Sequence, residues 1–395
     1  MPGRHFLFVP GPTNVPDRVL RAMHRAQEDH RSSAFPALPK SIFPDLKKVF
    51  GSEAGQPFIF PATGSAMWEA SLVNSLSPGD RVLACRNGQF SHLFIDCAQR
   101  LGMHVDVIEA DWGEAVPASR IGAALAADPS HEIKAVLVVH NETATGVTSD
   151  MAAIRAAMDA PRHPALLLVD GVSSVGSLAF RFDEWKVDFA IAGSQKGFMM
   201  PAGLGLLCVS AKGLAMAAQA KCPRAFFDVR DQAKHNADGY FPYTPALAHL
   251  FGLREALDML LEEGLDQVAA RHRRLGEGVR LAVAAWGLRL CARDANAVSN
   301  TVSAVVVPEG ADSKRVIDIA FRRYNLSLGA GLGRLAGRVF RIGHVGDLNE
   351  LMLLGALSGV EMALNDAGIP VALGSGVAAA QAWYRRCASP PAVTQ

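Results

Sequence analysis

Two apolar runs in this sequence each lead to a charged residue: Ala165-Leu-Leu-Leu-Val169 is followed by Asp170, and Val187-Asp-Phe-Ala-Ile-Ala192 is followed by Gly193-Ser-Gln-Lys196. Both runs are apolar at nearly every position, which is typical of strands that are covered on both faces of a parallel sheet. In an open α/β sheet, ligands bind beyond the carboxyl ends of the strands. Asp170 and Lys196 are therefore the first candidates for functional residues.

The same alternation of short apolar runs and helical segments extends over residues 57–200. Further strands are predicted at Pro57–Phe60, Arg81–Cys85, His104–Ile108 and Lys134–Val139, with helices at 65–76, 118–127 and 151–159. Strands separated by helices of this length favour a mainly parallel sheet with helices on both faces.

The pattern changes in the last third of the chain. Long helical periodicity runs from 244 to 286, and it is followed by a strand at 302–307, a helix at 313–324, a glycine-rich loop at 329–337, a strand at 339–342 and a helix at 348–364. This order predicts a small α+β domain. We expect an N-terminal arm over 1–20, a large domain over 21–265 and a small domain over 266–395, with a frayed tail from Ala388.

Composition excludes several classes of function. Of the 395 residues, 50% are hydrophobic and 19% are charged, so a large core can be buried. The net charge of +1 leaves no basic excess for nucleic acid, and no apolar run approaches the roughly 20 residues of a membrane span. The six cysteines form no CxxC pair, and the histidines form no HExxH motif, so no disulfide framework or metal site is expected. We expect a soluble enzyme of a reducing compartment.

A lysine at one strand end, 26 positions after an aspartate at a neighbouring strand end, suggests pyridoxal 5'-phosphate as a cofactor. This cofactor needs a lysine amine for its Schiff base and a carboxylate beside its pyridine nitrogen. The loop Thr63-Gly64-Ser65 precedes a predicted helix and could bind the phosphate. Taken singly, the lysine could be a solvated loop residue and the aspartate a helix cap. Their joint occurrence at strand ends favours the cofactor site.

The sequence resembles the class V (fold type I) pyridoxal-phosphate aminotransferases, and most closely their serine–glyoxylate and alanine–glyoxylate group. The resemblance runs nearly end to end and includes the motifs Pro10-Gly-Pro-Thr-Asn-Val-Pro16, Pro61-Ala-Thr-Gly64, Asn87-Gly-Gln-Phe90, His140-Asn-Glu-Thr-Ala-Thr-Gly146, Val169-Asp-Gly-Val172, Gly193-Ser-Gln-Lys196, Tyr243-Thr-Pro245, Val339-Phe-Arg-Ile-Gly343 and Gly374-Ser-Gly-Val-Ala-Ala379. It implies an α/β fold: a large domain with a mainly parallel seven-stranded sheet, and a small C-terminal α+β domain.

The resemblance also implies roles for individual residues. Lys196 would form the Schiff base and then shuttle the proton, and Asp170 would pair with the pyridine nitrogen. Phe90 would stack on the cofactor ring, Val172 would pack against it, and Thr143 would lie beside the phenolic oxygen. Thr63, Gly64, Ser65 and Gln195 would hold the phosphate. Arg341 would bind the substrate α-carboxylate.

A homodimer is implied as well, because Thr244 would reach the phosphate of the partner subunit. Where the family usually has a tyrosine three residues before that threonine, this chain has Phe241, flanked by Tyr240 and Tyr243. Any of these three side chains could take the place of the family's tyrosine beside the phosphate.

We expect the enzyme to transfer the amino group of serine to glyoxylate, and the partners to be small amino and 2-oxo acids. Alanine or aspartate as donor, a non-catalytic cofactor-binding protein and a cysteine desulfurase are the alternatives. A desulfurase needs a cysteine on a mobile Ser/Gly-rich loop, which neither Cys291 nor Cys387 has. The segment Gly331-Leu-Gly-Arg-Leu-Ala336 matches a dinucleotide-binding pattern, but a strand is predicted where that motif requires a helix. Because the C-terminal residues are no peroxisomal address, we expect the cytoplasm.

Overall fold

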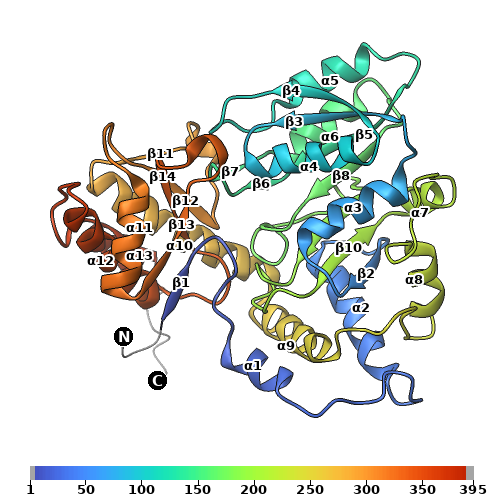
Figure 1. The fold of residues 1–395 in the computed structure, drawn as a ribbon, viewed down its shortest axis with the longest axis horizontal. Helices are drawn as coiled ribbons and strands as arrows, with labels where there is room; N and C mark the ends of the chain where they lie inside the picture. The colour runs from blue at the N-terminus through green and yellow to red at the C-terminus, as the bar shows by residue number, and fades with distance from the viewer. Residues whose placement is uncertain (1–4, 388–395) are drawn as a thin grey trace, which may run out of the picture.

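A seven-stranded sheet forms the centre of the larger lobe in the computed structural model, which describes residues 5–387 (Figure 1). The tail from Ala388, for which we expected fraying, lies outside the described residues. The strand order is β2 (Gln56–Phe60), β10 (Gly205–Val209), β9 (Phe189–Gly193), β8 (Leu166–Asp170), β5 (Ile133–Val139), β3 (Arg81–Arg86) and β4 (His104–Glu109). The five strands from β9 to β4 run parallel, whereas β10 is antiparallel to both of its neighbours. The mainly parallel seven-stranded sheet is confirmed.

Helices cover both faces of this sheet, so alternate residues of each strand pack into two different cores. In β8, Leu167 and Val169 face one core, and Leu166 and Leu168 face the other. The first core is covered by α2 (Ala37–Val49), α5 (Ala118–Ala126), α6 (Met151–Asp159) and α9 (Leu247–Glu263). The second is covered by α3 (Gly64–Ser75), α4 (Gln89–Arg100), α7 (Ala211–Ala217) and α8 (Val229–Asn236). This double burial explains why the strands read as continuous apolar runs.

The smaller lobe is built on a five-stranded sheet with the order β1 (Phe6–Phe8), β13 (Leu326–Ala330), β14 (Val339–Gly343), β12 (Val302–Val306) and β11 (Arg289–Leu290). Its helices are α10 (Leu265–Ala285), α11 (Ser313–Tyr324), α12 (Glu350–Asp366) and α13 (Ser375–Cys387). The N-terminal strand β1 pairs in parallel with β13, so part of the expected arm completes the C-terminal sheet.

Two local expectations need correction. The helical periodicity from 244 to 286 belongs to two helices, α9 and α10, which are separated by Gly264 with a φ of +85°. Glycine adopts this left-handed backbone without steric cost, so the chain can turn there. Part of the expected glycine-rich loop is the strand β13, followed by the short helix η2 (Gly333–Leu335).

The domain boundaries at 20/21 and 265/266 stay a prediction. None of the helices in residues 5–387 is long and apolar enough to cross a membrane.

Candidate active site

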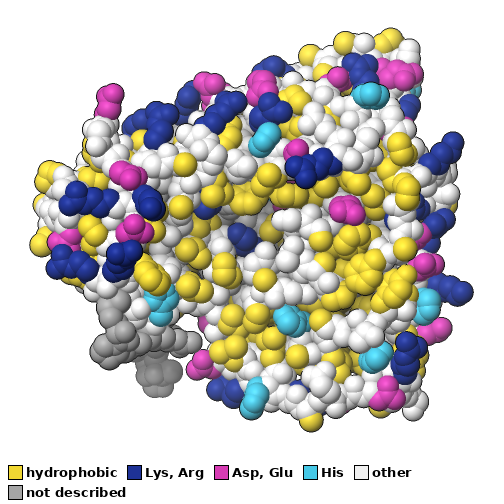
Figure 2. All heavy atoms as spheres, in the orientation of Figure 1, with side chains coloured by type: hydrophobic (Ala, Val, Ile, Leu, Met, Phe, Trp, Pro, Cys, Tyr) yellow, Lys and Arg dark blue, Asp and Glu magenta, His cyan; other side chains and the backbone are white. Residues whose placement is uncertain are grey.

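A cavity of about 330 Å³ lies at the carboxyl ends of β8 and β9. Most of the expected site residues line it, namely Ser65, Phe90, Thr143, Asp170, Val172, Gln195 and Lys196. Gly11, Pro12, Trp68, Asn141, Ser173 and Ala202 complete the wall. Figure 2 shows the surface hollowed between the two lobes, with basic atoms at the floor of the hollow and hydrophobic side chains around it. Residues that are far apart in the sequence therefore converge on one site.

Asp170 is a buried carboxylate that two donors hold in place. Its Oδ1 accepts the backbone N–H of Val172 at 2.8 Å, and its Oδ2 accepts the indole N–H of Trp68 at 2.9 Å. Burial raises the pKa of Asp170, while these two hydrogen bonds and the charge of Lys196 oppose the rise. The carboxylate is thus fixed in orientation and stays available to bind a cation or a protonated ring nitrogen.

Lys196 follows β9 and is half-buried in the wall of the cavity. Its Nζ donates to the carbonyl of Pro10, and Thr13 binds the backbone carbonyls of Gln195 and Lys196. Gly11 has a φ of +109°, a backbone conformation that favours glycine, and a Cβ there would lie 2.5 Å from the Lys196 side chain. Burial, reinforced by the charge of Arg341, lowers the pKa of Lys196 to about 8, while Asp170 opposes this shift. A lysine in this state is partly neutral near pH 8 and can act as a nucleophile or a base.

Arg341 does not line the cavity itself but lies directly behind its wall, on β14. Its Nη1 donates to the carbonyl of Thr143 at 3.1 Å, and its Nε donates to the carbonyl of Ala330 at 2.8 Å. The side chain is only 7% exposed, and burial lowers its pKa to about 10. No carboxylate within residues 5–387 forms an ion pair with it, so the guanidinium remains available to an anionic ligand.

The N-terminus of α3 forms the end of the cavity that suits an anion. Thr63 is the N-cap residue of α3, its side chain makes no capping hydrogen bond, and Gly64 and Ser65 form the first turn. A Cβ on Gly64 would lie 2.5 Å from Val172, so the close approach of helix and loop requires glycine. The side-chain oxygen of Gln195 is buried without a partner in the described protein. Free backbone N–H groups and hydroxyls at a helix N-terminus, together with the NH2 group of the Gln195 amide, are a donor set that fits a phosphate group.

Thr244 lies away from the cavity, exposed in the segment before α9. Of the three aromatic side chains near it, Tyr240 donates its hydroxyl to the carbonyl of Ser32, and Phe241 packs against Phe35. Tyr243 is 42% exposed and stacks on Phe226. Of these three side chains, Tyr243 alone therefore combines an exposed ring with a hydroxyl that is available to a neighbouring subunit.

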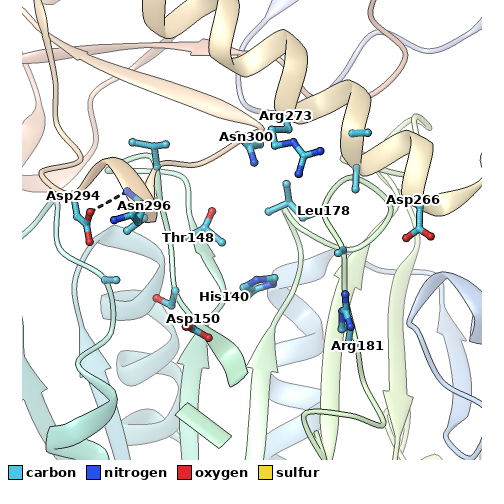
Figure 3. A pocket seen from close by; sticks show the side chains of 17 residues that line it. His140, Thr148, Asp150, Leu178, Arg181, Asp266, Arg273, Asp294, Asn296 and Asn300 are labelled. Carbon is cyan, nitrogen blue, oxygen red and sulfur yellow. Dashed lines mark hydrogen bonds between the residues drawn. The ribbon is translucent and has the colours of Figure 1, made fainter. Parts of the chain in front are cut away.

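A second and larger cavity, of about 740 Å³, is lined by residues of both lobes, among them His140 and Arg273 (Figure 3). No expected site residue lines it. Two of its three acidic residues, Asp150 and Asp294, cap helices by accepting the N–H groups of Ala153 and Asn296, and the third, Asp266, lies in the first turn of α10. His140 faces this cavity and packs edge-on against Phe180 and Trp185, and burial lowers its pKa to about 4. Because the buried amine, carboxylate and guanidinium are all elsewhere, the smaller cavity is the candidate active site.

Sequence reasoning missed several residues of the smaller cavity. Trp68 occurs inside a helix and resembles a core residue, and only the fold shows that its indole N–H reaches Asp170. Asn141 donates to Ser173 and to Thr301, and so joins the two lobes at the cavity wall. The segment Pro10-Gly-Pro12 belongs to one of the family motifs, but the sequence does not show that it contacts Lys196. The close spacing of proline and glycine there was the available signal.

The comparisons with known proteins agree with this geometry. The family model described as "Aminotransferase class-V" matches residues 5–331. The chain is 60% identical over 389 residues to a serine–glyoxylate aminotransferase of Methylorubrum extorquens, covering 97% of both chains. It is 50% identical over 386 residues to an L-aspartate–glyoxylate aminotransferase of Paracoccus denitrificans, covering 98% of both. The crystal structure of pyridoxamine–pyruvate aminotransferase from Mesorhizobium loti superposes with a TM-score of 0.90 at 30% identity, covering 97% of each chain. The protein belongs to the class V aminotransferase family.

Proposed function

We propose that this protein is a pyridoxal-phosphate-dependent aminotransferase that moves the amino group of serine to glyoxylate, which yields hydroxypyruvate and glycine. The observation that carries the proposal is one cavity lined by a lysine amine and a buried aspartate carboxylate, with an arginine behind the wall that pairs with no carboxylate of residues 5–387. The choice of substrates is supported by the 60% identity to a serine–glyoxylate aminotransferase.

Pyridoxal phosphate, when bound, supplies an aldehyde that takes up the amino group and a protonated ring that withdraws electrons from the substrate Cα. Asp170 is positioned to keep the ring nitrogen protonated, because an adjacent carboxylate favours the charged form. Lys196 would carry the cofactor, and once the substrate amine has displaced it, its Nζ would move the proton between the substrate Cα and C4′ of the cofactor. The pKa of about 8 suits this task, because a base works best near the pH of the reaction.

The remaining residues bind and orient. The start of α3, with Thr63, Gly64 and Ser65, and the amide of Gln195 hold the phosphate. Phe90 and Val172 offer apolar walls to the ring, and they exclude water from the reacting atoms. The hydroxyl of Thr143 lies in the same cavity, where it can donate to the phenolic oxygen.

Arg341 binds the α-carboxylate that every substrate of this reaction shares. A guanidinium matches a carboxylate with two parallel hydrogen bonds, and it is strongest where water is excluded. The two backbone carbonyls that Arg341 already contacts fix the plane of its guanidinium.

The test is a panel of initial rates with serine, alanine and aspartate as donors and glyoxylate as acceptor. We expect serine to give the highest kcat/KM, and glycine and hydroxypyruvate to form in equal amounts. Aspartate or alanine as the best donor would overturn the choice of serine but not the transaminase. Absence of glycine with all three donors would overturn the reaction itself.

We further propose a homodimer in which Thr244, assisted by Tyr243, reaches the phosphate in the partner's site. Hydrophobic side chains gather on the face that Figure 2 shows over β2 and α8, and the exposed Phe226 and Tyr243 belong to the segments beside α8. Sedimentation equilibrium should give twice the 42.0 kDa of the chain. Thr244→Ala should weaken cofactor binding without dissociating the dimer.

The cytoplasmic location is a prediction that cell fractionation can test.

A further inference from the structure

Glu142 is a buried carboxylate that connects two walls of the cavity and has no role in the proposal above. It belongs to the short strand β6 (Asn141–Glu142) and is fully buried. Its Oε2 accepts the backbone N–H groups of Phe90 and Ser91 at 3.0 and 2.9 Å. Both donors lie in the first turn of α4, where the unsatisfied N–H groups and the helix dipole favour a negative charge.

The approach of Glu142 to this helix depends on Gly88, the N-cap residue of α4. A Cβ at this position would lie 2.3 Å from the carboxylate carbon of Glu142. Any other residue would push the carboxylate away from the helix end. The glycine and the glutamate therefore form one arrangement, and this arrangement fixes the position of Phe90.

The second oxygen of Glu142 holds the other wall. Its Oε1 accepts the N–H of Ala144 at 3.1 Å, and the carbonyl of the intervening Thr143 accepts the Nη1–H of Arg341. The charge of Glu142 raises the pKa of Arg341 against the effect of burial. The two side chains form no direct ion pair in the described protein. Because backbone N–H groups occupy the carboxylate, it provides a counter-charge without covering the guanidinium.

Building on the proposed function, we propose that Glu142 is a positioning residue for substrate binding. It holds the start of α4 and the Thr143–Ala144 turn with one carboxylate, so that Phe90 and Arg341 keep their relative placement. It also supplies a counter-charge near Arg341 while its own oxygens stay bound to backbone N–H groups, so that the guanidinium is left free for the carboxylate of amino donors and 2-oxo acid acceptors.

A merely structural buried glutamate is present in the same chain and serves as a matched control. Glu361 is 2% exposed and accepts the N–H groups of Gly374, Gly376 and Val377, together with the indole N–H of Trp286. It holds α12 and α13 together in the smaller lobe and contacts no residue of the cavity wall through these bonds.

The experiment compares the holoenzymes of Glu142→Gln and Glu361→Gln with the parent. In Glu142→Gln the amide oxygen can still accept from Phe90 and Ser91, but its NH2 group then faces the N–H of Ala144, donor against donor. We expect both variants to lose thermal stability. Only Glu142→Gln should raise KM for serine and glyoxylate by about tenfold, with a smaller fall in kcat, which corresponds to one hydrogen bond to a charged group.

Binding of glycolate, measured by calorimetry, tests the same effect without turnover, because glycolate has the carboxylate but neither an amine nor a reactive carbonyl. Its Kd should rise by about the same factor in Glu142→Gln only. The charged groups that act on Arg341 are Glu142 and Lys196, and Asp170 lies beside Lys196. Loss of the Glu142 charge lowers the pKa of Arg341, so glycolate binding should weaken at a lower pH than in the parent.

Unchanged KM and Kd values, together with a stability loss like that of Glu361→Gln, would overturn the proposal. If Glu142→Gln does not fold, Glu142→Asp keeps the charge but shortens the reach. In Glu142→Asp the Kd for glycolate should be raised, but binding should start to weaken at the same alkaline pH as in the parent. A Kd for glycolate equal to that of the parent would also reject the proposal. A parent that binds glycolate but does not transaminate would instead reject the proposed function alone.

Discussion

Replacement of Trp68 by phenylalanine tests how the site controls Asp170. The indole N–H of Trp68 is one of two hydrogen-bond donors to this buried carboxylate, at 2.9 Å, and its ring stacks on Phe94. Phenylalanine keeps an aromatic ring in the stack but removes the donor. This hydrogen bond lowers the pKa of Asp170, whereas burial raises it, so its loss must raise the pKa further.

The size of the effect follows from the strength of one hydrogen bond to a charged group. Such a bond contributes about 1.5–3 kcal/mol, which corresponds to a pKa shift of roughly 1–2 units. Asp170 would then stay protonated up to a higher pH and would lose its effect on the ring nitrogen. The acidic limb of the kcat profile should therefore move up by about 1–2 pH units, measured with serine and glyoxylate.

Trp286→Phe is the matched control, because Trp286 is equally buried and donates to Glu361 at the same 2.9 Å, far from the cavity. Both variants should lose a similar amount of stability in urea unfolding. Only Trp68→Phe should shift the pH profile. An acidic limb at the same pH as in the parent would show that Trp68 is a packing residue and that the Val172 N–H alone orients Asp170.

The other predictions concern the lysine, the arginine and the start of α3. Lys196→Ala should abolish turnover and the visible absorbance of bound cofactor, and any residual turnover near the parent's rate would reject its assignment. Arg341→Lys should lower kcat/KM in both half-reactions by a factor that corresponds to roughly 2 kcal/mol or more, because a point charge cannot form the bidentate pair. Stopped-flow traces with serine and with glyoxylate should show equal losses. Gly64→Ala should weaken cofactor binding by about 1–3 kcal/mol, because its Cβ would overlap Val172. Gly355→Ala, where a Cβ meets nothing within 4 Å, should leave the cofactor Kd unchanged.

The local pattern of the sequence was sufficient to predict the central strands and the placement of Asp170 and Lys196 at one edge of the sheet. Runs such as Leu166–Val169 are apolar because both faces of the strand are buried, and this signal needs no knowledge of the neighbours. Asp170 follows such a run directly, and Lys196 follows the run Val187–Ala192 after three residues, so their placement at one edge of the sheet followed from the parallel arrangement. The resemblance to a known family then supplied the roles that residue types alone left open.

The direction and the partners of the strands were decided only by tertiary structure. Whether β10 runs parallel or antiparallel to β9 depends on the path of the connecting chain, and an apolar run reads the same in both cases. The pairing of Phe6–Phe8 with residues 326–328 joins segments at opposite ends of the sequence. No local propensity encodes such a contact, because its energy comes from groups that meet only after folding.

The supporting residues of the site were likewise decided by the fold. Trp68 and Glu142 have sequence neighbourhoods that fit a core tryptophan and a turn glutamate. Their contacts with Asp170, Phe90 and the turn before Ala144 arise because separate elements pack within hydrogen-bond distance. The sequence by itself therefore predicted which groups would perform the chemistry, since those groups must be specific residue types at strand ends. Tertiary structure alone decided what holds them, because any buried donor or acceptor at the right distance can satisfy them.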